Sequence, residues 1–236
     1  MIGLIGLGLV GSTLVGRFRA AGLDVVGYDI DASKVDAAVQ AGARRGESPS
    51  HVDSLCRRVV LSLPNSDVVD DVISGSGGIF DHLQPGDLVI DTTTSDPDRA
   101  VGVARRINGK DAHFLDATIL GSSKMVADGE ALVMVGGEAD QVARGRDILD
   151  TIGRRTFHMG PNGKGAQAKL VVNLVLGLNR LVLAEGLMLG KKADIDPNIL
   201  LSVLKEGVAY SRTMDTKGHK MVDEEFSTEA RLSQHL

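Results

Sequence analysis

Two residues in the second half of the chain have the types and the spacing needed for acid–base chemistry on a small molecule. Lys169 and Asn173 lie four residues apart in the mostly apolar stretch 163–186, GKGAQAKLVVNLVLGLNRLVLAEG. In a helix this spacing puts both side chains on one face. An amine removed from water can have its pKa lowered toward neutrality and accept a proton, and an amide can hydrogen-bond the same molecule without adding charge. The alternative is a solvated lysine beside an unrelated asparagine, the usual situation for lysine.

A glycine-rich hexamer near the N-terminus has the G-x-G-x-x-G spacing of a dinucleotide-binding turn. It consists of Gly6, Leu7, Gly8, Leu9, Val10 and Gly11. A strand is predicted before it at residues 1–7 and a helix after it at 9–22, which is the context the motif requires. Gly6 allows the tight turn, Gly8 lets a pyrophosphate approach the backbone, and Gly11 allows close packing of helix on strand. The phosphates would lie at the amides of the helix N-terminus.

Asp29 ends the next predicted strand, residues 24–29, and indicates which dinucleotide binds. Its carboxylate can accept hydrogen bonds from both ribose hydroxyls of the adenosine half and would repel a 2′-phosphate. No arginine follows at once, because the next residues are Ile30 and Asp31. We therefore expect the cofactor to be NAD rather than NADP.

Short β-rich runs alternate with helical segments through the first 160 residues. Further strands are expected at residues 58–64, 87–94, 113–118, 131–137 and 155–159. Helices are expected at 31–41, from Ser66, after the Asp96 cap with Pro97 in the first turn, and at 139–152. This alternation predicts an α/β fold in which a doubly wound, mostly parallel Rossmann-type sheet has helices on both faces.

The chain changes character after the Gly-Pro-Asn-Gly segment at residues 160–163. From about residue 165 onward it is predicted to be helical, including a helix with an Asp196 cap and Pro197. We therefore expect an NAD-binding domain at residues 1–162. Residues 163–236 are expected to hold a long interdomain helix and the start of an all-α domain for substrate binding or oligomerisation.

The composition excludes several classes of protein. The 236 residues are 43% hydrophobic and 24% charged, and a net charge of -5 argues against a nucleic-acid partner. A single cysteine, Cys56, rules out an internal disulfide framework and suits a cytoplasmic location. No signal-peptide pattern or clustered metal-ligand spacing is visible. Polar residues interrupt the long helix too often for a membrane span, so we expect it to be buried in protein.

Four segments, in order, resemble the β-hydroxyacid dehydrogenase family, typified by 3-hydroxyisobutyrate dehydrogenase. They are GLIGLGLVGSTLVGRFRAAG, LSLPNSDVV, DATILGSSKMVADGEALVMVGG and GPNGKGAQAKLVVN. The resemblance covers essentially the whole chain. It implies that Lys169 lines a cleft between two domains and handles the proton of the substrate hydroxyl, with Asn173 contacting the substrate one turn later.

The resemblance also assigns residues to the nicotinamide half of the cofactor. Leu63, Pro64 and Asn65 correspond to the loop along the nicotinamide ribose, and Thr94 corresponds to a position near the ring. The structural alternatives for these residues are a strand end and a helix cap. Asp91 is either a loop-fixing residue or a ligand contact.

The substrate segment departs from the family pattern, Asp-Ala-Pro-Val-Ser-Gly-Gly. Here residues 116–122 read Asp-Ala-Thr-Ile-Leu-Gly-Ser, so Leu120 replaces the serine that donates to the substrate carboxylate. We hypothesise that the amides of Gly121 and Ser122, with the Ser122 hydroxyl, hold the carboxylate, and that Leu120 makes the pocket more apolar. Lys124 either extends this anion site or is a surface charge.

Together these features predict an NAD-dependent dehydrogenase of a small β-hydroxy acid such as 3-hydroxyisobutyrate, or a reductase of the matching semialdehyde. One alternative keeps the chemistry but acts on glyoxylate, succinic semialdehyde or tartronate semialdehyde. Another is a dinucleotide-binding protein without catalysis. A homodimer or homotetramer is expected. The sequence ends at ARLSQHL, where relatives continue with a Lys-Asp pair, so we expect the helical domain to be incomplete.

Overall fold

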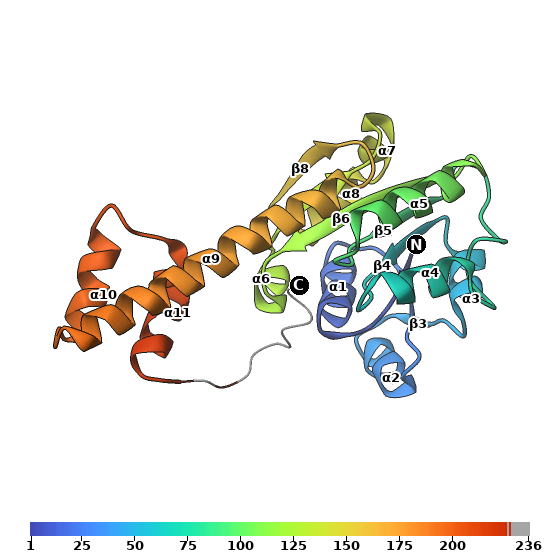
Figure 1. Ribbon diagram of the computed structural model, residues 1–236. Coiled ribbons are helices and arrows are strands. Elements are labelled where there is room, and N and C mark those ends of the chain that lie inside the picture. Colours follow the sequence, from blue (N-terminus) through green and yellow to red (C-terminus); the bar gives the residue numbers. More distant parts are fainter. Residues whose placement is uncertain (226, 228–236) are drawn as a thin grey trace. The chain divides into compact units, whose positions relative to one another are not determined.

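A computed structural model describes residues 1–225 and 227 of the chain (Figure 1). The chain divides into two compact units, Met1–Lys169 and Leu170–Leu236, and the division lies inside one long helix. The domain boundary expected from the sequence, between residues 162 and 163, falls just before that helix and stays a prediction. Residues 230–236, where the next motif of the family is expected to begin, lie outside the described residues.

The N-terminal unit is built on an eight-stranded sheet in the order β3-β2-β1-β4-β5-β6-β7-β8. Its strands are β1 (Ile2–Ile5), β2 (Val25–Tyr28), β3 (Arg44–Arg45), β4 (Arg58–Leu61), β5 (Leu88–Asp91), β6 (His113–Leu120), β7 (Leu132–Gly136) and β8 (Arg155–Gly160). Neighbouring strands in this sheet are parallel except for the antiparallel pair β6 and β7. The expected doubly wound, mostly parallel sheet is confirmed.

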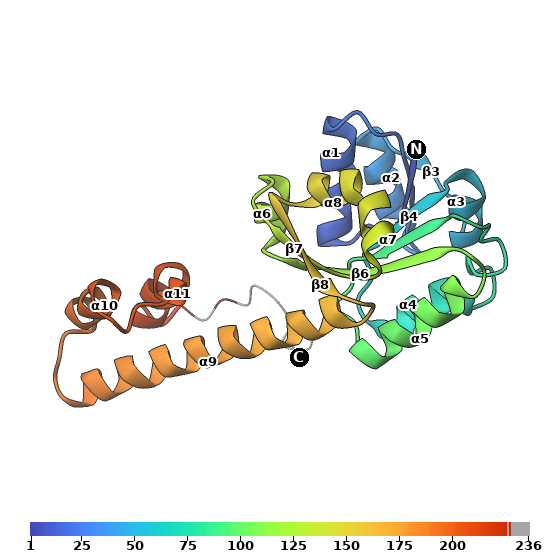
Figure 2. The same ribbon diagram turned by 90° about the horizontal axis from the view of Figure 1, so that it is seen from above.

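Helices cover both faces of the sheet, and each face has its own hydrophobic layer (Figure 2). One layer is formed with α1 (Leu9–Ala20), α2 (Ala32–Gln40), α6 (Ser123–Ala127), α7 (Ala139–Arg144) and α8 (Arg146–Ile152). The other is formed with α3 (Pro49–Leu55), α4 (Ser66–Ser74) and α5 (Pro97–Asn108). Phe18 on the first face and Phe114 on the second are fully buried. This double coverage explains why the central strands β1, β4 and β5 are mostly apolar and mostly buried.

Local sequence signals set several of these helix ends. The Asp96 carboxylate accepts the amides of Asp98 and Arg99 at the start of α5, and Pro97 occupies the first turn, as expected. Asp196 caps α10 (Pro197–Glu206) in the same way. Such caps satisfy first-turn amides that have no acceptor inside the helix.

The helix expected at residues 139–152 is wrong as a single element. The structure has two helices there, α7 and α8, which meet at Gly145. A Cβ on Gly145 would lie 3.2 Å from the Leu115 side chain, so the bend brings the backbone close to the sheet. Glycine is a poor residue for a helix interior, which favours the break at this position. The short elements β3, α3 and α6 have too few residues to give a periodic signal, and the sequence did not predict them.

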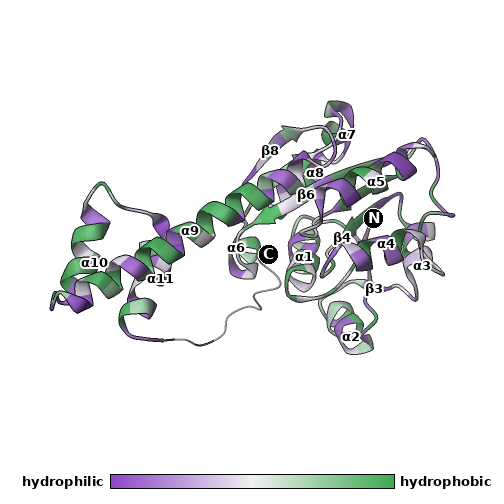
Figure 3. Cartoon of the chain, in the orientation of Figure 1, coloured by the Kyte–Doolittle hydropathy of each residue, from purple (hydrophilic) through white to green (hydrophobic). Residues whose placement is uncertain are grey.

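The C-terminal unit consists of most of α9 (Lys164–Lys192) together with α10 and α11 (Arg212–Val222). Its small core contains Leu183, Leu187, Leu201 and Met214. Figure 3 colours much of α9 as hydrophobic. The expectation that the long helix is buried is wrong for the described chain, since many apolar side chains of α9 are exposed. Those between 41% and 70% exposed are Leu170, Val171, Leu174, Val175, Leu178, Leu181, Val182, Met188 and Leu189.

Of the helices that the structure describes, α9 is long and apolar enough to cross a membrane by length and composition alone. Only 11% of its most apolar window is buried. Length and composition are a weak criterion, because a helix that packs against other protein can pass it as well. The length and composition of α9 therefore do not establish what covers its apolar surface.

Candidate active site

The candidate cofactor residues lie at one edge of the sheet. The glycine loop follows β1, Asp29 follows β2, residues 63–65 follow β4, and Thr94 follows β5. These strands are parallel, so their carboxyl ends share an edge. Strand β6 is parallel to β5 and brings Leu120, Gly121 and Ser122 to the same edge. In open α/β sheets ligands bind at this edge.

The glycine loop has the geometry that a pyrophosphate needs. Gly6 has a φ of 93°, and a Cβ there would lie 2.2 Å from the Ser62 carbonyl oxygen. A Cβ on Gly11 would lie 2.0 Å from the Gly6 carbonyl oxygen, so α1 packs directly on the turn. A Cβ on Gly8 would meet nothing within 4 Å. Gly8 is also the N-cap of α1 and has no side chain, so the first amides of the helix are available to an anion.

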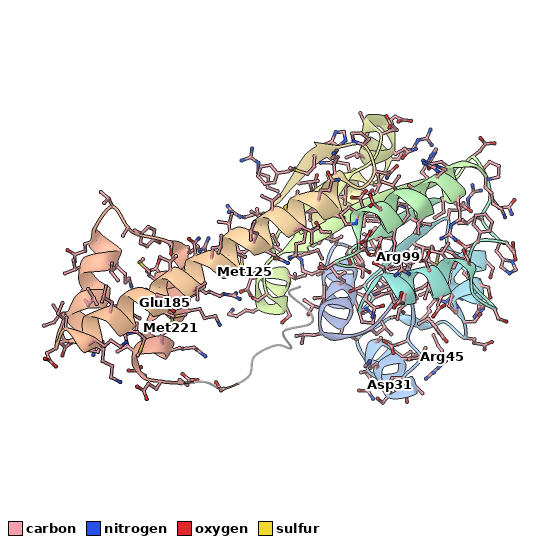
Figure 4. The ribbon with its side chains drawn as sticks, in the orientation of Figure 1. Asp31, Arg45, Arg99, Met125, Glu185 and Met221 are labelled. Carbon is pink, nitrogen blue, oxygen red and sulfur yellow. The ribbon has the colours of Figure 1, made fainter. Side chains whose placement is uncertain are left out.

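Asp29 ties the glycine loop to the second strand. Its Oδ2 accepts the Leu7 amide at 2.8 Å, and its Oδ1 accepts the Asp31 amide at 2.9 Å. The Lys34 ammonium lies 3.4 Å from Oδ1, and the Asp29 side chain is 9% exposed. Asp31, labelled in Figure 4, caps α2 by accepting the Ser33 amide. The carboxylate is thus fixed where an adenosine ribose would lie next to the loop.

The two loops expected at the nicotinamide end are linked by a residue that the sequence did not single out. The Leu63 amide donates to the Thr93 hydroxyl at 3.1 Å. Asn65 accepts the Val68 amide and caps α4, while Pro64 is exposed and Thr94 is half-buried. The sequence signal that could have identified Thr93 was its position next to Thr94, which was itself expected near the nicotinamide ring.

Asp91 holds the second of these loops in shape. Its Oδ1 accepts the Thr93 amide at 2.9 Å, and its Oδ2 accepts the Ser95 hydroxyl at 3.2 Å. Burial raises the pKa of Asp91 to about 6, against the lowering effect of those hydrogen bonds. Of the two roles considered for Asp91, the structure shows the loop-fixing one.

The substrate segment lies at the end of β6. Leu120 is half-buried, whereas Gly121, with a φ of 151°, and Ser122 are exposed. The Ser122 hydroxyl accepts the Met125 amide at 3.2 Å and caps α6. Lys124 is exposed and pairs with Asp128 at 2.7 Å, which makes it a surface charge. These positions leave the Gly121 and Ser122 backbone open to a ligand.

Lys169 belongs to the same edge of the sheet. Its side chain is half-buried, and its Nζ donates to the Ile119 carbonyl oxygen at 2.7 Å, one residue before Leu120. Burial lowers the pKa of the Lys169 amine, and no ion pair with a carboxylate is found for it within residues 1–225. Asn173 follows four residues later on the same face of α9 and is half-buried. Its contact with a substrate stays a prediction.

Two family models together match almost all of the chain. Residues 1–160 match the family described as the NAD-binding domain of 6-phosphogluconate dehydrogenase. Residues 163–236 match the family described as the NAD-binding part of NADP-dependent 3-hydroxyisobutyrate dehydrogenase. The chain belongs to the β-hydroxyacid dehydrogenase family. Its N-terminal unit is accordingly the NAD(P)-binding Rossmann domain of an oxidoreductase family.

Two curated members of the β-hydroxyacid dehydrogenase family show how far the similarity extends. The chain is 30% identical over 195 residues to glyoxylate/succinic semialdehyde reductase 2 of Arabidopsis thaliana, covering 83% of this chain and 54% of that protein. It is 30% identical over 177 residues to the mitochondrial 3-hydroxyisobutyrate dehydrogenase of Mus musculus, covering 75% of this chain and 53% of that protein. The chain thus aligns with about half the length of each.

Among solved structures, the chain resembles a 3-hydroxyisobutyrate dehydrogenase of Mycobacterium tuberculosis with L-serine. The TM-score is 0.90 at 23% identity, over 97% of this chain and 80% of that one. At this identity the likeness establishes the fold of a β-hydroxyacid dehydrogenase and nothing about the ligand.

Proposed function

We propose that the chain transfers a hydride between NAD and a small β-hydroxy acid like 3-hydroxyisobutyrate, or its semialdehyde. Lys169 is the proton acceptor in oxidation and the donor in reduction. The observation that carries this proposal is the position of the Lys169 amine, which is half-buried and 2.7 Å from the Ile119 carbonyl at the start of the substrate segment. A bound NAD, held by Gly6–Gly11, Asp29, residues 63–65 and Thr94, would supply the nicotinamide ring that accepts the hydride.

The surroundings of Lys169 suit an amine that changes protonation. Burial is the cause that lowers its pKa, and no carboxylate within residues 1–225 forms an ion pair that would hold the proton on it. The Ile119 carbonyl accepts one N–H, which both the charged and the neutral amine can donate. The lone pair of the neutral amine is then free to take the proton of a substrate hydroxyl.

The substrate carboxylate is assigned to Gly121 and Ser122. These residues come shortly after Ile119, whose carbonyl oxygen accepts a hydrogen bond from the Lys169 amine. Both residues are exposed and follow Leu120, whose side chain adds no hydrogen bond. Asn173 would bind the same substrate as a neutral hydrogen-bonding group. This arrangement fits a short acid that carries its hydroxyl a few bonds from the carboxylate.

NAD is the proposed cofactor because the Asp29 carboxylate is fixed at the end of β2 by the Leu7 and Asp31 amides. A fixed negative charge there disfavours a 2′-phosphate. Lys34 lies 3.4 Å from the same carboxylate and reduces that repulsion. Measuring kcat/KM with NAD and with NADP tests the assignment, and a preference for NADP would overturn it.

The second candidate is a reductase of glyoxylate, succinic semialdehyde or tartronate semialdehyde. Its support is the Leu120-Gly121-Ser122 segment and the similarity to the Arabidopsis reductase. A screen of short hydroxy acids with NAD and of short aldehydo acids with NADH separates the two candidates. Saturable NAD binding without turnover in either direction would instead indicate a dinucleotide-binding protein without catalysis.

We also propose that the chain forms a homodimer or homotetramer in the cytoplasm. The exposed apolar side chains of α9 form a surface that a partner chain would remove from water. Light scattering after size-exclusion chromatography measures the mass directly, and a monomer at micromolar concentration would contradict the proposal. The cytoplasmic location rests on the composition, with its single cysteine, and cell fractionation tests it.

A further inference from the structure

Hydrogen bonds made by the side chains of Asp116, Thr118 and Lys169 connect residues 116–119 of β6 to residues 163–169 at the start of α9. The Asp116 carboxylate accepts the amides of Gly163 at 2.8 Å and Ala166 at 3.0 Å. The Thr118 hydroxyl donates to the Gly165 carbonyl oxygen at 3.0 Å. The Lys169 amine then donates to the Ile119 carbonyl oxygen. All the residues involved belong to the N-terminal unit.

Asp116 supplies the cap that α9 lacks in its own sequence. The helix begins at Lys164 after Gly163, which has no side chain to accept first-turn amides. The Asp116 side chain is buried and takes that place from a strand 47 to 50 residues earlier in the chain. A carboxylate at a helix N-terminus is also favoured by the helix dipole.

Thr118 acts on the peptide group that holds the Lys169 backbone. In an α-helix the carbonyl of residue 165 is the acceptor for the amide of residue 169. The Thr118 hydroxyl, on a residue that is 1% exposed, binds that same carbonyl. A chain with the proline of the usual family pattern at this position could not form this bond, because proline has no hydroxyl.

Glycines allow the helix to lie this close to the strands. A Cβ on Gly165 would be 2.2 Å from the Asp116 carbonyl oxygen and 2.7 Å from that of Met134. A Cβ on Gly136 would be 2.6 Å from the Asp116 carboxylate. The first turn of α9 therefore has little freedom to shift along β6 and β7.

We propose that Asp116 and Thr118 are positioning residues for Lys169, because they fix the start of α9 on β6 and so set the amine against Ile119. The inference rests on the proposed function for its catalytic meaning. The pH midpoint of Lys169 reactivity, which depends on the surroundings of the amine, can be measured without turnover.

The decisive variant is Thr118→Val, which keeps the shape of the side chain and removes its hydroxyl. Thr118→Ser restores the hydroxyl, and Thr151→Val is a matched control, since the Thr151 hydroxyl also donates to a helix carbonyl, that of Asp147 in α8. Pulse acetylation of the 236-residue chain across a pH series, followed by peptide mass spectrometry, gives the midpoint of Lys169 reactivity in each variant. Asp116→Asn is a second test, provided that it folds.

In Thr118→Val we expect the Lys169 midpoint to rise toward that of an ordinary lysine, as the amine gains water. Thr118→Ser and Thr151→Val should keep the wild-type midpoint. Under the proposed function, Thr118→Val should also lower kcat roughly tenfold while leaving the Kd for NAD unchanged.

An unchanged Lys169 midpoint in Thr118→Val would overturn the positioning role, whatever happens to activity. If the wild-type chain oxidises no hydroxy acid, the proposed function fails, but the comparison of midpoints still decides whether Thr118 positions the amine.

Discussion

The Leu7 amide and the Asp29 carboxylate are joined by a 2.8 Å hydrogen bond that connects the glycine loop to the end of β2. The residue expected to distinguish NAD from NADP therefore also helps to shape the phosphate-binding turn. A substitution at Asp29 that removes only the charge can separate these two effects, because an amide oxygen can still accept the Leu7 amide.

Asp29→Asn should lower the ratio of kcat/KM for NAD to kcat/KM for NADP by roughly tenfold to a hundredfold, since the charge that repels a 2′-phosphate is gone. If turnover is too slow, Kd values from calorimetry give the same ratio. Asp24→Asn is the control, because Asp24 precedes β2 and is an exposed partner of Arg19. An unaltered cofactor ratio in Asp29→Asn would remove the argument for NAD.

The glycine loop allows a prediction in which binding and stability respond to different positions. Gly8→Ala should fold with near-normal stability, because a Cβ there meets nothing within 4 Å. It should weaken NAD binding by about tenfold or more, since the pyrophosphate is proposed to approach the backbone through that space. Gly11→Ala should instead lower the free energy of unfolding by roughly 1–3 kcal/mol, because its Cβ would clash with the Gly6 carbonyl.

Gly16→Ala is the control for both glycine variants. It lies on α1 with nothing within 4 Å of its Cβ, so it should bind NAD normally and gain stability from a better helix former. Denaturant titration and calorimetry measure the two properties. Normal NAD binding by Gly8→Ala would show that the loop does not hold the cofactor as described.

The fold and the cofactor loop could be predicted because their signals are local. The spacing of Gly6, Gly8 and Gly11 and the Asp96-Pro97 helix start each lie within a few residues. The break at Gly145 was missed because the apolar pattern continues through it, although a glycine in a helix interior was a local signal for it. Its close packing on Leu115 is a contact that the sequence does not show.

The parts of the site that escaped prediction depend on contacts between distant segments. Asp116 lies 47 residues before Gly163, and Thr93 lies 30 residues after Leu63. The sequence did contain one signal for the contact between Asp116 and Gly163, because a long helix that starts at glycine needs a capping group from elsewhere in the chain. The exposure of α9 could not be predicted either, because an apolar helix does not specify which surface covers it.

Lys169→Ala should reduce kcat by roughly a hundredfold to ten-thousandfold while leaving NAD affinity unchanged, because it removes the proposed proton acceptor and none of the proposed cofactor contacts. Lys164→Ala is a matched control on the same helix, since Lys164 is exposed and bonds only to Gln167 among the hydrogen bonds found for its side chain in residues 1–225. Near-normal turnover by Lys169→Ala would refute the catalytic assignment.

The rate of alcohol oxidation should rise with pH through the pKa of Lys169, because only the neutral amine accepts a proton. Burial lowers that pKa from 10.5, so the rise should be complete at a lower pH than for an ordinary lysine. Aldehyde reduction should show the opposite dependence, since it needs the protonated amine. Initial rates between pH 6 and about pH 10 in both directions test this pair of profiles.

Ser122 offers a test of the carboxylate site in which helix capping is held constant. Ser122→Asn and Ser122→Asp both keep an oxygen that can cap α6 in place of the Ser122 hydroxyl. The aspartate also places a negative charge next to the proposed carboxylate. We expect KM for a hydroxy acid to rise roughly tenfold more in Ser122→Asp than in Ser122→Asn, with little change in KM for NAD. Equal KM values in the two variants would place the substrate carboxylate elsewhere.

The free energy of unfolding should fall as the pH rises from about 4 to about 7, in part because of Asp53 on α3. Burial, reinforced by repulsion from Asp87, raises the pKa of Asp53 to about 7, and its Oδ1 has no hydrogen-bond partner among the described residues. The folded state therefore keeps a proton that the unfolded chain releases above its ordinary pKa of 3.8. Stability is greatest while both states are protonated, declines between the two pKa values by up to roughly 4 kcal/mol, and is level above the higher one.

Asp53→Asn should remove this part of the pH dependence, because an amide does not ionise. The variant should unfold at higher denaturant concentration than the wild type at pH 8, whereas the two should differ much less at pH 4. Asp81→Asn, which changes an exposed acid, should follow the wild type at both values. Denaturant titrations at pH 4, 6 and 8 measure the slopes. If Asp53→Asn shifts stability by the same amount at every pH, then Asp53 does not carry a raised pKa in the folded chain, and its unpaired oxygen is stabilised by some contact other than a proton.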